Sequence, residues 1–249
     1  MSIVILGGLG LVFGLLLGYA ALRFAVEEDP RVEAILEALD GCNCGACGFG
    51  GCKAYAEAAA SGECPPDLCV PGGEETAKAV AEILGKEVKA QARRRVAEVA
   101  CIGSPDVAHE RYEYDGVPDC KFAHNYMGGY KACQYGCLGL GTCVEACPFD
   151  AISMGENKLP RVDEDLCTGC GVCVKACPRG VIRLVDYERH GKVVLCNSKD
   201  KGKITREVCE VGCIGCKACV KACAQDAIVV EDNLAFIDHT KCTTCGACV

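Results

Sequence analysis

The chain has 249 residues, of which 25 are cysteine, and its formal net charge is −8 at pH 7. This acidic balance argues against a nucleic-acid partner, because phosphate binding needs clustered lysine and arginine. Cysteine at about 10% of the chain indicates a scaffold held either by disulfides or by metal. The cysteines stand in tight triplets, which rarely all find disulfide partners but readily surround an iron–sulfur cluster, so we expect metal.

The chain begins with an uncharged apolar run of 20 residues, Ile3 to Leu22, which predicts a single transmembrane helix within an anchor over residues 1–26. A cleaved signal peptide would carry positive charge before the run, and a dinucleotide-binding loop would need a further glycine. Gly10, Gly14 and Gly18 share one helix face, which favours packing against helices of other membrane subunits, although glycine is common in such helices. Arginines follow the run and none precedes it, so the rest of the chain should face the cytoplasm.

A small helical [4Fe–4S] module is expected over residues 30–73, because four cysteines there are interleaved with glycines. The backbone must turn tightly round a cluster and point its N–H groups at the sulfur atoms, and glycine allows this. Cys42 and Cys64 are left over, as spare thiols or as ligands. A helical linker over residues 74–95 is expected to follow. The predicted ligands are Cys44, Cys47, Cys52 and Cys69.

Two copies of one pattern follow, over residues 96–187 and 190–249, and each predicts a bacterial-type ferredoxin fold with two [4Fe–4S] clusters. In the run C-x2-C-x2-C-x3-C-P, three cysteines bind one cluster and the fourth crosses to the other. A zinc ribbon would instead offer two separated C-x2-C pairs. The predicted ligands are Cys137, Cys143, Cys147, Cys167, Cys170, Cys173 and Cys177 in the first copy, and Cys213, Cys216, Cys219, Cys223, Cys242, Cys245 and Cys248 in the second.

The spacing assigns most of these ligands to particular clusters. One cluster takes the triplet that begins at Cys167 with Cys147 as its fourth ligand, and another takes the triplet that begins at Cys242 with Cys223. The triplet that begins at Cys213 lacks a fourth ligand before Val249, so the second module is expected to be cut short.

The first copy is irregular, because Leu140 stands where the second copy has Cys216. An insertion in the first copy adds Cys120, which has no counterpart in the second. One loss and one gain favour a replacement by Cys120, and Cys133 is the rival. The replacement would complete a cluster with Cys137, Cys143 and Cys177.

Four more cysteines exceed what two clusters in each copy require. Cys101 and Cys133 in the first copy match Cys196 and Cys209 in the second. They are either buried structural thiols or ligands of a modified site, and the sequence leaves both interpretations open. In total, the spacings predict about 4–6 clusters.

These features together resemble the B subunit of the Rnf complex, a membrane-bound ferredoxin:NAD+ oxidoreductase that moves Na+ or H+. The resemblance rests on the run from Arg23 to Pro30, the glycine-rich segment from Cys44 to Cys52, the segment from Cys69 to Gly73 and the ferredoxin modules. Short members of the family have one regular ferredoxin module, so this chain is similar to the longer form found in anaerobic bacteria.

The resemblance implies an α+β electron carrier with no catalytic residue. The chain would accept electrons from reduced soluble ferredoxin and relay them through [4Fe–4S] clusters to the other Rnf subunits at the cell membrane. Flavin and NAD would be held by those other subunits, in agreement with the lack of an intact dinucleotide motif. The alternative is a membrane-anchored polyferredoxin subunit of another reductase or hydrogenase that pumps no ion.

Overall fold

The computed structural model describes residues 2–24, 29–87, 94–189 and 191–249, without the side chains of residues 2–6, 21 and 22. Residues 88–93 of the predicted linker lie outside the described residues, as do residues 1, 25 and 26 of the predicted anchor and residue 190. The helices are α1 (Ser2–Arg23), α2 (Pro30–Ala38), α3 (Cys52–Ser61), α4 (Gly73–Leu84), α5 (Cys120–Asn125), α6 (Thr142–Glu145), α7 (Val172–Ala176), α8 (Gly202–Val208) and α9 (Ala218–Ala222). The strands are β1 (Arg95–Val99), β2 (Ile152–Met154), β3 (Pro160–Val162), β4 (Ile182–Asp186), β5 (Ile228–Glu231) and β6 (Leu234–Ile237).

The predicted transmembrane anchor depended on α1. Among the residues that the structure describes, no helix is both long and apolar enough to cross a membrane, so the prediction of a single transmembrane helix was wrong. The sequence argument rested on composition over the whole apolar run, Ile3 to Leu22, at the length that a hydrocarbon core of about 30 Å requires. A Cβ added at Gly10, Gly14 or Gly18 would meet nothing within 4 Å in the described part of the chain, which shows no packing partner there.

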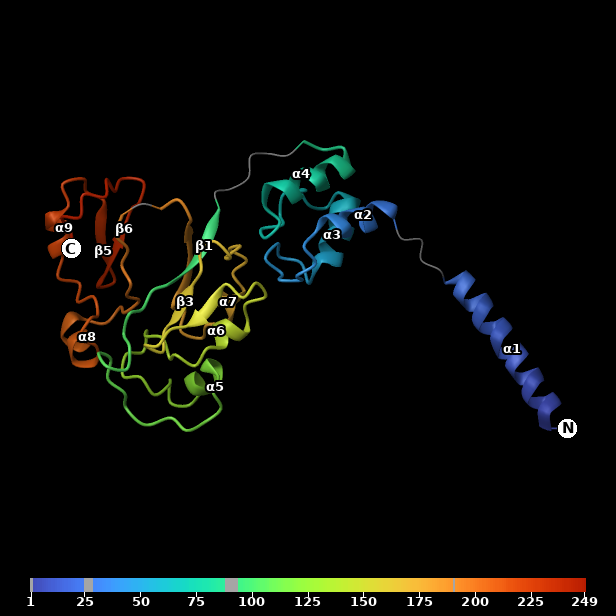
Figure 1. The fold of residues 1–249 in the computed structure, drawn as a ribbon, viewed down its shortest axis with the longest axis horizontal. Coiled ribbons are helices and arrows are strands. Elements are labelled where there is room, and N and C mark those ends of the chain that lie inside the picture. The colour runs from blue at the N-terminus through green and yellow to red at the C-terminus, as the bar shows by residue number, and fades with distance from the viewer. Residues whose placement is uncertain (1, 25–28, 88–93, 190) are drawn as a thin grey trace.

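The N-terminal module is built on three packed helices, α2, α3 and α4 (Figure 1). Helix α2 begins where the Asp29 carboxylate accepts a hydrogen bond from the Arg31 backbone N–H at 2.9 Å, with proline at the first helical position. Ile35, Tyr55 and Val80 are at most 1% exposed and form the centre of the core. Helix α4 ends at Leu84, next to a left-handed Gly85, so the predicted linker is helical over only part of its length.

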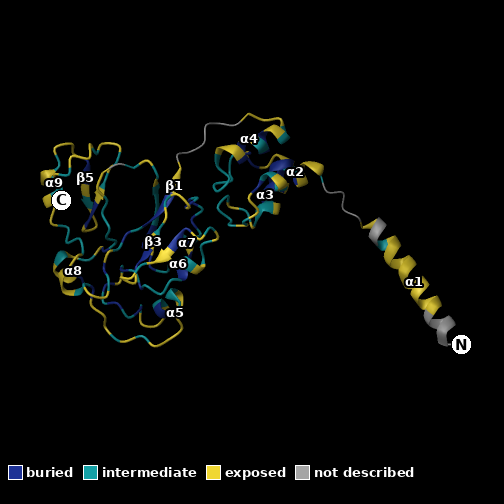
Figure 2. Cartoon of the chain, in the orientation of Figure 1, coloured by how far each residue is buried: buried dark blue, intermediate teal, exposed yellow. Residues whose placement is uncertain are grey.

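In the first ferredoxin module, strands β1 and β4 pair with each other, and the short helices α6 and α7 pack together, α7 also contacting β4. Strand β1 runs antiparallel to β4, with Arg95 opposite Asp186 and Val99 opposite Ile182, and β2 forms a hairpin with β3. Its buried core combines small apolar residues with cysteines, and Figure 2 shows buried residues gathered around β1, β3 and α7. Cysteine therefore fills positions that leucine or phenylalanine would occupy in an ordinary core of this size.

The second ferredoxin module has α8, α9 and the β5–β6 hairpin, and it is joined to the first by backbone hydrogen bonds. The His109 N–H donates to the Val208 carbonyl at 3.0 Å, and the Glu210 N–H donates to the Val107 carbonyl at 2.9 Å. The inserted segment of the first copy thus runs beside the end of α8, and Ala108 forms an isolated bridge with Cys209.

A buried carboxylate ties β1 to β4. Glu98 is 6% exposed and forms ion pairs with Arg183 at 2.6 Å and with Arg189 at 3.3 Å. We expect Glu98→Gln to lower the free energy of unfolding by about 3 kcal/mol, because it leaves two cations beside a buried neutral group. The matched control is Glu74→Gln, which breaks an exposed pair with Lys78 and should cost at most about 0.5 kcal/mol. Anaerobic denaturant unfolding of both variants measures the difference, and equal values would contradict the prediction.

Candidate iron–sulfur centres

Five cavities, each lined by four or five cysteines, contain 21 of the 25 cysteines of the chain. All 25 thiols are free of disulfides. The described residues contain no group of three or more ligands close enough to hold a single metal ion. A cubane carries an iron at each of four corners, and four thiolates spaced around a cavity match that geometry. The cysteines outside the cavities are Cys64, Cys213, Cys216 and Cys219.

The first cavity lies in the N-terminal module and is lined by all four predicted ligands, which we call the N-terminal centre: Cys44, Cys47, Cys52 and Cys69. The Cys52 N–H donates to Asn43 Oδ1 at 2.8 Å, which holds the start of α3 against the loop. Cys42 lines the same cavity, whereas Cys64 is 7% exposed and packs into the helical core. The two leftover cysteines therefore have different surroundings, which the spacing did not separate.

The second cavity lies under β1, and its four cysteines form what we call the Cys167 centre: Cys147, Cys167, Cys170 and Cys173. The spacing predicted this combination, including the crossing ligand. The Ala97 N–H of β1 donates to Cys167 Sγ at 3.3 Å. Such N–H donors stabilise negative charge on cluster sulfurs, so this strand contributes to the centre.

The third cavity contains Cys120, and its four cysteines form what we call the Cys120 centre: Cys120, Cys137, Cys143 and Cys177. The Cys120 N–H donates to Thr142 Oγ1 at 2.7 Å, and this hydroxyl lies 3.1 Å from the Asp119 carboxylate that caps α5. Leu140 is not among the residues that line the cavity. The structure thus brings Cys120, rather than its rival Cys133, beside the other three thiols.

The second ferredoxin module repeats this geometry in part. Its cavity is lined by four cysteines that we call the Cys242 centre: Cys223, Cys242, Cys245 and Cys248. The remaining triplet also lies together: burial raises the pKa of Cys219, and the nearby thiols of Cys213 and Cys216 raise it further. Cys216 is exposed.

Comparisons with known proteins agree with these centres. A family model described as "4Fe-4S dicluster domain" matches residues 132–184, and one described as "Putative Fe-S cluster" matches residues 39–71. The chain is 51% identical over 249 residues to the B subunit of the proton-translocating ferredoxin:NAD(+) oxidoreductase complex of Clostridium ljungdahlii, covering 99% of this chain and 86% of that protein. It is 51% identical over 245 residues to the B subunit of the Na(+)-translocating ferredoxin:NAD(+) oxidoreductase complex of Acetobacterium woodii, covering 98% of this chain and 73% of that protein.

The same likeness extends to a third relative. The B subunit of the ion-translocating oxidoreductase complex of Methanosarcina acetivorans is 47% identical over 249 residues, covering 100% of this chain and 93% of that protein. The chain belongs to the B-subunit family of the Rnf complexes.

Membership confirms the resemblance seen in the sequence. The chain is an electron-transfer subunit of an ion-translocating ferredoxin:NAD+ oxidoreductase, it carries multiple [4Fe–4S] clusters, and its partners include other Rnf subunits. The alternative of a polyferredoxin in a different reductase or hydrogenase is set aside, because the relatives match over nearly the whole chain.

Burial shifts the thiols of these centres away from ionisation. It raises the pKa of Cys137 and of Cys143 to about 12, and that of Cys173 to about 11. The neighbouring cysteines act in the same direction, because one thiolate opposes the formation of another. Iron is bound by thiolates, so cluster assembly in these cavities releases protons.

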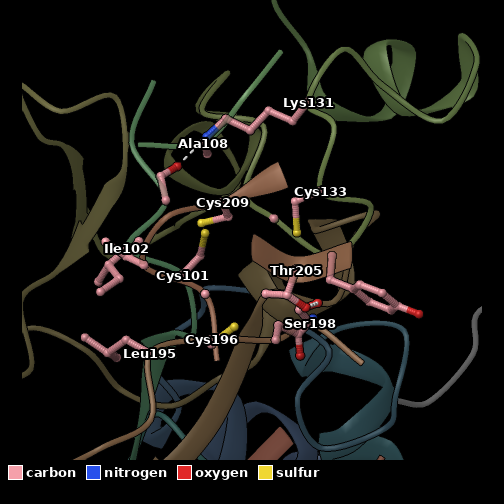
Figure 3. Close-up of a pocket in the computed structure, with 16 residues that line it drawn as sticks. Cys101, Ile102, Ala108, Lys131, Cys133, Leu195, Cys196, Ser198, Thr205 and Cys209 are labelled. Carbon is pink, nitrogen blue, oxygen red and sulfur yellow. Dashed lines mark hydrogen bonds between the residues drawn. The ribbon is translucent and has the colours of Figure 1, made fainter. Parts of the chain in front are cut away.

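The fifth cavity contains the four cysteines that the sequence left without a role. We call it the inter-module cavity, and Figure 3 shows its cysteines on several sides of one space. Burial raises the pKa of Cys133, a hydrogen bond from the Tyr135 backbone lowers it, and three other thiols raise it further. The sequence predicted two separate pairs, one in each copy, and the structure brings both pairs together. The four are Cys101, Cys133, Cys196 and Cys209.

Proposed function

We propose that this chain is the electron-input relay of its complex, accepting electrons from reduced ferredoxin and passing them through its clusters to the other subunits. The observation that carries the proposal is that neighbouring centres adjoin one another across module boundaries. The proposed ligands are the four cysteines of each centre named above, together with Cys213, Cys216 and Cys219.

The contact between the N-terminal module and the first ferredoxin module supports the first step of this relay. Lys175 of α7 donates from Nζ to the Gly45 carbonyl at 3.4 Å. Burial raises the pKa of Cys44 to about 11, and the nearby Cys170 thiol raises it slightly further. One ligand of the Cys167 centre therefore lies near a ligand of the N-terminal centre.

The next step lies within the first ferredoxin module. Burial raises the pKa of Cys143 to about 12, and the nearby thiols of Cys177 and Cys173 raise it further. Ligands of the Cys167 centre and the Cys120 centre therefore lie near one another. When bound, a [4Fe–4S] cluster supplies one-electron redox chemistry, and the chain tunes it through burial, N–H donors and nearby charge. The relay needs no acid–base residue, because electrons move without making or breaking a covalent bond.

We propose that each module predicted from the sequence has its own role. Residues 30–73 hold one cluster, residues 74–95 connect this module to the next, and residues 96–187 and 190–249 are the two ferredoxin modules. The cluster modules face the cytoplasm, where reduced thiols persist and soluble ferredoxin is found.

The test uses the complex purified without oxygen. Reduced ferredoxin is mixed with it, and the EPR signals of the clusters on this chain are followed by rapid freezing. We expect these signals to appear before the flavins of the other subunits are reduced. Flavin reduction that precedes every cluster signal of this chain would contradict the input role. Dithionite-reduced complex serves as the control that the clusters are redox-active.

A further inference from the structure

The inter-module cavity lies between the two ferredoxin modules, and each module contributes half of its cysteines. Cys101 and Cys133 come from the first copy, and Cys196 and Cys209 come from the second (Figure 3). All four are buried or half-buried. If each pair were only a structural feature of its own copy, the two pairs would not need to line the same cavity. Their shared cavity therefore indicates a common role.

Backbone contacts hold this cavity in shape. The bridge between Ala108 and Cys209 fixes the end of α8 against the inserted segment. A Cβ added at Gly103 would lie 3.4 Å from Cys209 Sγ and 3.6 Å from Cys101 Sγ, so one glycine adjoins sulfurs from both copies. A larger side chain at this position would fill the space between them.

The size of the cavity matches that of a cluster site. Its empty volume is about 410 Å³, and the four centres with predicted cluster ligands have about 400, 330, 300 and 390 Å³. The cavity therefore resembles the four centres. Because the described residues contain no group of three or more ligands close enough for a single metal ion such as zinc, the resemblance favours a cubane.

Two buried cations adjoin this cavity. Lys131, which is 2% exposed, donates from Nζ to the Gly103 carbonyl at 2.6 Å. Arg179, which is 8% exposed, donates to the Cys133 carbonyl and also lines the Cys120 centre. Buried cations are costly unless negative charge lies nearby, and a cluster held by four thiolates supplies it.

The cavity is joined to a cluster ligand of each module by the same hydrogen bond. The Cys137 N–H donates to Cys101 Sγ at 3.4 Å, and the Cys213 N–H donates to Cys196 Sγ at 3.3 Å. Cys137 belongs to the Cys120 centre, and Cys213 belongs to the triplet of the second module. On each side, one hydrogen bond therefore connects a cysteine of the cavity to a predicted cluster ligand of the module.

We propose that Cys101, Cys133, Cys196 and Cys209 bind a further [4Fe–4S] cluster that carries electrons between the two ferredoxin modules. This inference rests on the proposed relay function and gives it the link that two separate modules would lack. Each transfer moves one electron and no proton, so that one cluster is oxidised as its neighbour is reduced. No other reactant is required.

The first test counts iron and acid-labile sulfide in the full chain purified without oxygen. We expect Cys209→Ala to lose about four iron and about four sulfide relative to the unsubstituted chain. The matched control is Cys64→Ala, because Cys64 is equally buried, at 7% against 8% exposed, but lies in the helical core. The control should retain all of its iron.

The outcomes separate this inference from the proposed function. Unchanged iron and sulfide in Cys209→Ala, or loss of a zinc ion in place of iron, would overturn the inter-module cluster. If the alanine variant loses all iron through unfolding, Cys196→Ala, on the other side of the cavity, provides the second measurement under the same criterion. An unsubstituted chain that contains no clusters would instead defeat the relay function as a whole.

The second test measures electron transfer between the modules by rapid-freeze EPR. In Cys209→Ala, clusters of the module reduced first should show their signals at the normal rate, and those of the other module should appear far more slowly. Cys64→Ala should keep both rates. Equal rates in a Cys209→Ala chain that lacks the four iron atoms would show that electrons do not pass through this site.

Discussion

Cys120→Ala is expected to remove one cluster from the chain, a loss of about four iron and about four sulfide. Cys120 lines one cavity with Cys137, Cys143 and Cys177, and α5 and the Thr142 hydroxyl hold it in place. Alanine offers no ligand, and a cubane with three protein thiolates is easily lost. Iron analysis with EPR of the anaerobic protein measures the effect. Full retention of iron would show that Cys120 is not a ligand.

A second substitution, at Leu140, tests whether Cys120 serves as a ligand because the loop lacks a cysteine at this position. Leu140 stands between two glycines with left-handed φ, Gly139 at +75° and Gly141 at +80°. The same conformation flanks Cys170 in the regular loop, at Gly169 (+71°) and Gly171 (+75°). The loop at Leu140 therefore retains the backbone shape of a three-cysteine cluster loop.

We expect Leu140→Cys to restore the lost iron in the Cys120→Ala background. The added thiol would complete the regular spacing with Cys137 and Cys143. Leu140→Ser in the same background is the matched control and should restore little. If Leu140→Cys does not restore iron, the side chain at position 140 does not point at the cluster, although the backbone angles of the loop match those of the regular loop.

Removal of iron is expected to unfold the second ferredoxin module while the N-terminal helices keep part of their protection. The buried apolar residues of the second module are few, chiefly Ala227, Ile228, Leu234 and Ala235, whereas α2, α3 and α4 share a core around Ile35, Tyr55 and Val80 (Figure 2). A module with so little apolar burial depends on thiolate–iron bonds for its folding free energy.

Hydrogen exchange with mass spectrometry, after anaerobic chelation, measures this difference. Amides of β5 and β6 should exchange at the rate of an unfolded chain, and those of α3 should exchange more slowly. Chelation should proceed faster as the pH falls, because burial raises the pKa of thiols such as Cys143 and protons compete with iron for the sulfur. Persistent protection of the β5–β6 hairpin without iron would contradict the expectation.

The sequence alone determined those features of this protein that depend on residues close together along the chain. Cys167, Cys170 and Cys173 lie within seven residues of one another on a glycine-containing loop, so their spacing is enough to place them round a cluster. Family membership also followed from local signatures. The transmembrane prediction failed in the described residues, because it relied on composition over the whole apolar run.

Only the tertiary structure decided the positions of cysteines that no local spacing connects. Cys120 lies far from Cys177 along the chain, and the conformation of the inserted segment brings them to one cavity. Cys101 and Cys209 belong to different copies. They line one cavity because the backbone of residues 107–109 is hydrogen-bonded to that of residues 208–210. Such contacts depend on how the modules dock, and no periodic pattern in the sequence encodes this docking. The spacing therefore left the roles of the two pairs open, and the fold places all four cysteines around a single cavity.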